Sequence, residues 1–328
     1  MVQPYLMLFL SVILVIISSY IFVNGLEYAQ HRMKWTETFT GSIVSPVFTS
    51  FPELIVILVA IFAVGKSAGD QVGIGTIFGE PFMASSLAYS AVLAAVVLAY
   101  ARKRRKDMSM HLDSDLFLPF LFTAIIFPVL VIPVFFLNRA VQDITGTALI
   151  LLYILYFVIS ARKRMSLEEN EGGNLLLSRI VKPWIGSIIQ ISLSAAGLYA
   201  GSVILVSSIE NIATLSSISP LSLAILIVPV ATIVPETMSA FIWAYKGKDT
   251  TAVASLVGEK VIFTTLFPGI VLLIIPWEVG AASYFSVLAT VTVSAIYLPM
   301  VIRRKIPGYA LSAGVIFFIL FVYFVFII

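Results

Sequence analysis

Two segments of this chain share one pattern of proline, threonine and glutamate, and each lies within a long apolar stretch. Residues 46–53 and residues 229–236 both read P-V-x-T-x-x-P-E, and they lie 183 residues apart. In both copies a further glutamate, Glu27 or Glu210, lies 26 residues before the last residue of the pattern. A carboxylate is costly inside hydrocarbon, so two at equivalent positions of a duplicated unit indicate a cation site.

Several oxygen ligands accompany the two central glutamates, Glu53 and Glu236. The two prolines of each segment remove backbone donors, so we expect both helices to break there and to free carbonyl oxygens. Thr49 and Thr232 lie four residues before the glutamates, on the same helical face, and Ser50 can add a hydroxyl. Such a set of hard oxygens suits Ca²⁺, and Na⁺ would use similar oxygens with fewer charges.

A second pair of acids follows in the next apolar stretch of each copy. Glu80 and Glu259 each come directly after a glycine, and Lys260 follows Glu259. A charged residue in mid-membrane costs about 2.5–3.5 kcal/mol, so these side chains must converge on a polar cavity or pair with one another. An ion pair of Lys260 with Glu259 or Glu80 could simply hold helices together. Alternatively, Lys260 could occupy a cation position.

Composition identifies an integral membrane protein. Of 328 residues, 60% are hydrophobic and 11% are charged, where a soluble domain carries about a quarter charged residues. The net charge of +3 does not indicate nucleic-acid binding, because the basic residues lie in short loops. The chain has no cysteine, which excludes thiolate metal sites. It also has no H-E-x-x-H, G-x-S-x-G or P-loop motif, so we expect neither an enzyme nor a cofactor.

The apolar stretches predict an all-α fold with ten transmembrane helices in two inverted five-helix repeats. The repeats are residues 1–161 and 183–328, joined by a cytoplasmic linker at 162–182. About 20 apolar residues cross a bilayer. We place the spans at residues 4–23, 40–64, 72–100, 115–137, 141–161, 183–207, 217–245, 251–275, 280–302 and 307–328.

The basic residues predict the orientation of these spans. The loops after the odd-numbered spans hold 17 of the 20 Lys and Arg residues, so these loops should be cytoplasmic. We therefore expect a multi-pass protein of the cell membrane with extracellular N- and C-termini. Five spans per repeat is an odd number, so the second repeat is inverted, as in many secondary transporters. The four tryptophans lie near span ends, where an aromatic belt is expected.

These motifs resemble the cation/calcium exchanger superfamily, most closely its sodium/calcium exchanger branch. The best-matching segments are Thr49–Glu53 and Thr232–Glu236, and the run from Ile212 to Glu236 is similar to the family's second repeat. The resemblance covers nearly the whole chain. It implies ten spans, in which the motif glutamates and threonines bind Ca²⁺ and Na⁺ competes in overlapping sites.

The chain departs from the family's pattern in the span that follows each motif. The usual Asn or Asp ligand is replaced by Ala84 and Phe263, and the acids Glu80 and Glu259 stand where the family has serine. Together with Lys260 the site carries four negative charges and one positive charge if all ionise. These extra carboxylates leave Na⁺ coupling and proton coupling both open.

We interpret the chain as a secondary active antiporter that exchanges Ca²⁺ for Na⁺ by alternating access at a midplane carboxylate site. The metal ligands would be Glu53, Glu236, Thr49, Thr232, Ser50, Glu80 and Glu259. A Ca²⁺ or other cation/H⁺ exchanger on the same fold is one alternative, and a transport-inactive ion sensor or scaffold is another. The expected partners are inorganic cations and the lipid bilayer, without nucleic acid, and the oligomeric state is left open.

Overall fold

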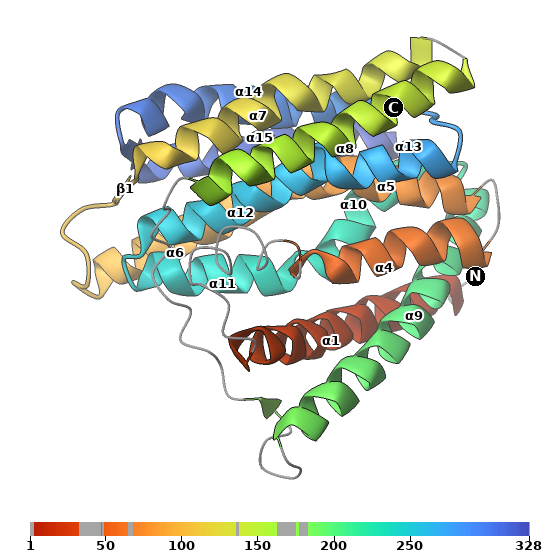
Figure 1. Ribbon diagram of the computed structural model, residues 1–328, viewed down its shortest axis with the longest axis horizontal. Helices are drawn as coiled ribbons and strands as arrows, with labels where there is room; N and C mark the ends of the chain where they lie inside the picture. Colours follow the sequence, from red (N-terminus) through yellow and green to blue (C-terminus); the bar gives the residue numbers. More distant parts are fainter. Residues whose placement is uncertain are drawn as a thin grey trace.

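The chain is built almost entirely of helices in the computed structural model, which describes residues 3–32, 47, 49–64, 68–135, 138–162, 175–176 and 183–327 (Figure 1). The first half contains α1 (Gln3–Arg32), α4 (Phe51–Val59), η2 (Ala60–Val64), α5 (Ala68–Met83), η3 (Ala84–Ala88), α6 (Tyr89–Ala101), β1 (Ser109–His111), η4 (Ser114–Leu116), α7 (Phe117–Ile126), η5 (Phe127–Phe135) and α8 (Arg139–Arg162). The second half contains α9 (Pro183–Ser216), α10 (Pro220–Thr232), α11 (Val234–Tyr245), α12 (Asp249–Thr264), α13 (Leu266–Ile274), α14 (Ala281–Ile302), β2 (Lys305–Pro307), η7 (Gly308–Ser312) and α15 (Ala313–Ile327).

The helices confirm the predicted all-α membrane class but not the count of ten spans. Within the described ranges, eight helices are long and apolar enough to cross a membrane, and the bent pair α10–α11 makes a ninth. A shorter apolar helix covers Phe51–Val64. The remainder of the expected second span, residues 40–46, lies outside the described residues. So does nearly all of the expected linker at 162–182, whose boundaries stay a prediction.

The two helices that begin the halves, α1 and α9, pack against each other along one side of the molecule (Figure 1). Small residues allow this close approach. A Cβ atom added at Gly201 would lie 2.9 Å from Val15, and one added at Gly25 would lie 2.8 Å from Ile191. Contacts therefore pair early residues of α1 with late residues of α9, so the helices run antiparallel. Equivalent helices of inverted repeats must run in this way.

The halves also cross where α5 meets α10. Gly75 and Gly79, one helical turn apart, face α10. A Cβ atom at Gly79 would lie 2.8 Å from the Ile225 carbonyl oxygen and 2.7 Å from Cγ of Pro229. This contact seats the α5 backbone directly on α10, and Glu80 follows immediately after Gly79. The glycines thus set the depth at which one acid of the predicted site lies.

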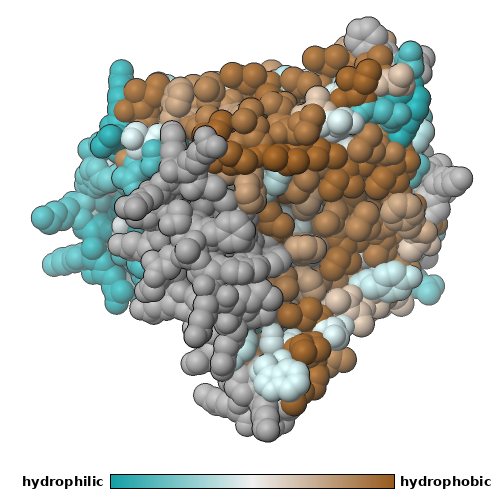
Figure 2. All heavy atoms as spheres, viewed as in Figure 1, coloured by the Kyte–Doolittle hydropathy of each residue, from teal (hydrophilic) through white to brown (hydrophobic). Residues whose placement is uncertain are grey.

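The described basic loops that follow α6, α11 and α14 gather at one end of the molecule. The Arg105 guanidinium forms a two-pronged salt bridge with Asp249, at 2.5 Å from Oδ1 and 2.7 Å from Oδ2, and this bond raises the pKa of Arg105. Nearby, β1 pairs antiparallel with β2, which joins the loop after α6 to the loop after α14. Figure 2 shows the hydrophilic surface at this end and a hydrophobic surface beside it.

One expectation about the aromatic residues is wrong. Trp277, which we placed in an interfacial belt, is only 2% exposed. Its indole nitrogen donates to the Leu130 carbonyl oxygen at 2.7 Å, and its ring lies 5.7 Å from the ring of Phe78. Trp277 therefore belongs to the core between the helices.

We predict that Gly79→Ala destabilises the protein by about 1–3 kcal/mol, because the added methyl group meets backbone and proline atoms that cannot move freely. Gly280→Ala is the control, since nothing lies within 4 Å of a Cβ atom at that position. Thermal unfolding in detergent measures both variants. Equal melting temperatures would show that α5 does not depend on the close contact with α10.

A second prediction concerns the salt bridge between Arg105 and Asp249. Asp249→Asn should destabilise the protein by roughly 1.5–3 kcal/mol, because it weakens charge-assisted hydrogen bonds to a largely buried guanidinium. Asp143→Asn, in the exposed pair with Arg139, should cost at most about 1 kcal/mol. Chemical denaturation compares the two variants. A cost at Asp143 that equals the cost at Asp249 would contradict this account.

Candidate cation site

Four helices, two from each half, each bury one glutamate. Glu53 lies on α4, Glu80 on α5, Glu236 on α11 and Glu259 on α12. Their side chains belong to residues that are 0%, 0%, 5% and 2% exposed, respectively. Burial of four acids is very costly in a chain of this size unless their charge is used or neutralised. All four glutamates predicted as metal ligands therefore lie inside the protein.

Helix breaks place the first pair of acids at the start of short helices. In the second copy, α10 ends at Thr232 and α11 begins at Val234 with a bend of 54°, so the predicted break is confirmed there. Glu236 lies in the first turn of α11, behind Pro235. Glu53 occupies the same place in α4, which begins after Ser50. The positive end of a helix dipole therefore lies beside each carboxylate.

The four carboxylates interact with one another electrostatically. Glu53 is within range of the other three, and Glu259 is within range of Glu80 and Glu236. The burial and mutual influence of these acids support the expected convergence on one polar region, which stays a prediction. No three acidic or histidine side chains in the described part of the chain are arranged to hold one metal ion. Side chains would have to close around a cation.

The second pair of acids is staggered. Glu80 and Glu259 share a preceding glycine, but Glu80 lies 27 residues after Glu53 and Glu259 lies 23 residues after Glu236. The difference of four residues is about one helical turn, or roughly 5.4 Å along the axis. The two acids therefore do not lie at equivalent positions of the two copies. The site is therefore asymmetric, although the motif that precedes it is duplicated.

Of the predicted hydroxyl ligands, Thr232 has the clearest place. Its Oγ1 donates to Oε1 of Glu80 at 2.5 Å, so the end of α10 is tied to α5 across the two halves. Ser50 is fully buried one turn before Glu53, whereas Thr49 is half-buried. The structure thus joins Thr232 to the carboxylate cluster and puts Ser50 close to it along the chain.

Lys260 does not form the ion pairs that the sequence allowed. It is fully buried, but neither Glu259 nor Glu80 is within salt-bridge distance of its ammonium group. Instead Nζ lies 4.6 Å from the ring centre of Tyr89 and 5.7 Å from that of Phe120. Glu259 and Lys260 are consecutive in α12, and consecutive residues of a helix do not face each other.

Sequence reasoning also missed a buried polar stripe on α14. Ser286 donates to the Phe78 carbonyl oxygen at 2.6 Å and so ties α14 to α5. The signal was available in the sequence, because hydroxyl residues recur there at intervals of three and four, as on one face of a helix. All are completely buried, namely Ser283, Ser286, Thr290, Ser294 and Tyr297.

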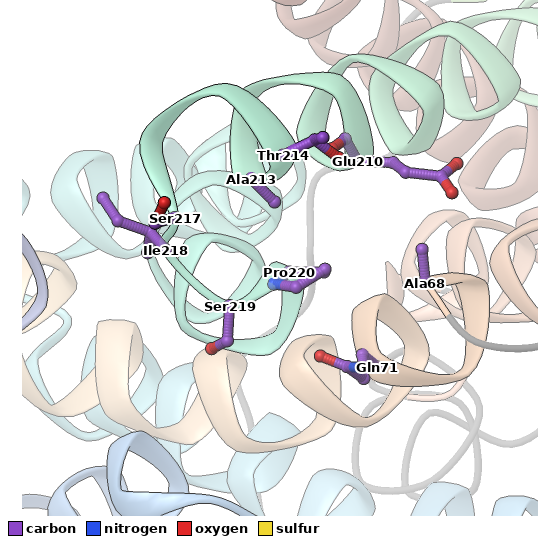
Figure 3. A pocket seen from close by; sticks show the side chains of 9 residues that line it. All are labelled: Ala68, Gln71, Glu210, Ala213, Thr214, Ser217, Ile218, Ser219 and Pro220. Atoms are coloured by element: carbon purple, nitrogen blue, oxygen red, sulfur yellow. The ribbon is translucent and has the colours of Figure 1, made fainter.

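A pocket of about 470 Å³ opens where α9, α10 and α5 meet (Figure 3). Glu210, one of the two repeated outer acids, extends from α9 over Ala68 of α5 (Figure 3). The pocket lies at the start of α10, whereas the basic loops lie near the end of α11, where Arg102 bonds to Tyr245. Its lining is largely polar or small, namely Ala68, Gln71, Glu210, Ala213, Thr214, Ser217, Ile218, Ser219 and Pro220.

We predict that Thr232→Val destabilises the protein by about 1–3 kcal/mol, because Glu80 loses a buried hydrogen-bond donor. Thr232→Ser keeps the hydroxyl and should retain most of the stability. Thermal unfolding of the two variants side by side checks this. Indistinguishable melting temperatures would mean that the hydroxyl does not support Glu80.

Known proteins resemble this chain in sequence and in fold. The family model described as sodium/calcium exchanger protein matches residues 4–162 and 186–328, which is most of both halves. No curated protein sequence matches the chain. The solved structure of the H⁺/Ca²⁺ exchanger CAX is similar with a TM-score of 0.75 and 15% identity, over 97% of this chain and 81% of CAX.

Two further solved structures have the same fold. Native YfkE has a TM-score of 0.69 and 15% identity, over 96% of this chain and 89% of YfkE. The sodium-calcium exchanger NCX_Mj has a TM-score of 0.58 and 18% identity, over 98% of each chain. The two matched segments, the inverted halves and the buried acids agree with the family assignment. This chain is a member of the sodium/calcium exchanger protein family, which consists of secondary transporters of cations and not of enzymes.

Proposed function

We propose that this protein exchanges Ca²⁺ for Na⁺ across the cell membrane at its carboxylate cluster. The observation that carries the proposal is the set of four buried, electrostatically interacting glutamates, one from each of α4, α5, α11 and α12. Glu53 and Glu236 would bind Ca²⁺ directly, while Glu80 and Glu259 would add charge. Ca²⁺ prefers 6–8 oxygen ligands, which hydroxyl groups and carbonyl groups can complete.

The hydroxyl groups that complete the Ca²⁺ coordination would come from Thr49, Thr232 and Ser50. Thr232 already contacts Glu80, so its oxygen would have to turn from that acid toward a bound ion. The freed carbonyls at the break between α10 and α11 offer further oxygens. Binding would therefore exchange protein–protein hydrogen bonds for protein–cation contacts.

Charge balance explains why such a site would act as an exchanger. Covering four carboxylates and one ammonium with apolar helix surface while they carry their full charge would have a large energetic cost. Either Ca²⁺ or enough of a competing cation must neutralise them before access can switch. Because both ions use the same carboxylates, binding of one would release the other, which is antiport.

The packing of α1 and α9 supports a moving part. These helices pack most extensively on each other, and α9 also touches α4 and α10 beside the acids. We propose that the pair slides over the other helices and opens the site to one side at a time. The pocket at Glu210 would be the access route from outside, and the basic loops would face the cytoplasm with both termini outside.

Proton coupling is the second candidate. The specific observation in its favour is that two acids, Glu80 and Glu259, supplement the motif glutamates, and a carboxylate can carry a proton in place of a metal cation. Among proteins of similar fold, CAX is an H⁺/Ca²⁺ exchanger and NCX_Mj is a sodium-calcium exchanger. The fold by itself therefore does not select the co-ion. A transport-inactive ion sensor remains the third candidate because Lys260 already supplies one positive charge near the site.

Uptake of ⁴⁵Ca²⁺ into proteoliposomes tests the proposal. We expect an outward Na⁺ gradient to drive uptake, and Glu53→Gln and Glu236→Gln to reduce it to the level of empty liposomes. Glu278→Gln, a change of an exposed acid, is the matched control and should transport normally. Uptake driven only by an outward proton gradient would favour the second candidate. No uptake under either gradient by folded protein would contradict antiport of Ca²⁺.

A further inference from the structure

Lys260 is an unusual residue for the interior of a membrane protein. It is fully buried near the middle of α12, directly after Glu259. Within the part of the chain that the structure describes, its ammonium group has neither a hydrogen bond nor a salt bridge. A buried charge without partners is costly, so the presence of this ammonium group in the interior requires a physical explanation.

Aromatic rings supply the immediate surroundings of the ammonium group. Nζ lies 4.6 Å from the ring centre of Tyr89 on α6 and 5.7 Å from that of Phe120 on α7. Tyr297 on α14 holds both rings, edge-on to Tyr89 at 5.0 Å and to Phe120 at 5.9 Å. The Tyr297 hydroxyl is itself anchored to the Ala310 carbonyl oxygen at 3.2 Å. Three helices thus build an aromatic cage, and the π faces of Tyr89 and Phe120 favour a cation.

The cage holds the ammonium group of Lys260 in the region of the acids, but the ammonium forms no salt bridge with Glu259 or Glu80. Lys260 directly follows Glu259 in α12, and both side chains are buried in the protein interior. In a medium of low dielectric constant electrostatic interactions reach well beyond contact distance. The ammonium therefore acts on Glu259 and its neighbours without forming a salt bridge to Glu259 or Glu80.

We propose that Lys260 is a specificity-determining residue, a tethered cation that balances one of the four carboxylate charges and so lowers by one the positive charge that the site takes from solution. This inference rests on the proposed function. With the ammonium in place, the ionised cluster has a net charge of −3, so one Ca²⁺ and one monovalent cation neutralise it. Without the ammonium the cluster would need one further positive charge.

Binding of Ca²⁺ to the purified full-length protein in detergent tests this role, measured by isothermal titration calorimetry at fixed pH and Na⁺ concentration. Lys260→Met should tighten Ca²⁺ binding by about tenfold or more, because a repelling charge is removed from a region of low dielectric constant. Lys260→Arg keeps the charge and should stay within about threefold of the wild type. Unchanged or weaker binding by folded Lys260→Met would overturn the inference.

Variants of the cage provide a second test that leaves the lysine in place. Tyr89→Leu removes the ring face that holds the ammonium, so the ammonium can approach the carboxylates and compete with Ca²⁺, and binding should weaken several-fold. Tyr89→Phe retains the ring and should differ little from the wild type. If Lys260→Met does not fold, the comparison of Tyr89→Leu with Tyr89→Phe tests the inference instead. Equal Ca²⁺ affinity of these two variants overturns it.

The wild-type titration separates the two proposals. If the wild type binds Ca²⁺ and Glu53→Gln does not, the proposed site stands, and the Lys260 and Tyr89 variants judge the tethered cation alone. If the folded wild type binds no Ca²⁺, the proposed function fails and the inference about Lys260 fails with it.

Discussion

The cost of burying negative charge in a membrane is the constraint on which this structure depends. Four glutamates, each at most 5% exposed, lie in one region that both halves of the chain build. Such a cluster is stable only when cations, protons or fixed positive charge compensate it. In the proposed mechanism the same requirement would couple transport to ion binding, because the protein would change its accessible side only when the compensating charge is complete.

The surrounding helices determine where these acids lie. Glu53 and Glu236 lie in the first turns of short helices, where backbone N–H groups favour negative charge. Glycines let α5 rest on the α10 backbone, which brings Glu80 to Thr232. The aromatic cage around Lys260 adds a positive charge at a fixed place. The helix N-termini, the glycine contacts and the aromatic cage come from different helices, but each affects the electrostatics of the same candidate site.

Much of this arrangement could be predicted from the sequence, because the repeated motif, the apolar stretches and the odd number of spans per repeat are local or periodic signals. The break at Pro235 and the antiparallel α1 and α9 follow from them. The partners of Lys260 could not be predicted, since Tyr89 and Phe120 lie far away in sequence. The stagger of Glu80 and Glu259 was missed because their shared glycine suggested equivalent positions, whereas the repeat offset places them one helical turn apart.

Anomalous diffraction from crystals soaked in Ca²⁺ or Sr²⁺ tests the central claim most directly, because it locates the ion without reference to transport. This account predicts one peak between Glu53 and Glu236, with carboxylate oxygens at about 2.3–2.6 Å from Ca²⁺, and loss of that peak in Glu53→Gln. A cation bound only at the outer pocket beside Glu210, or a carboxylate cluster that stays empty at saturating Ca²⁺, would contradict it.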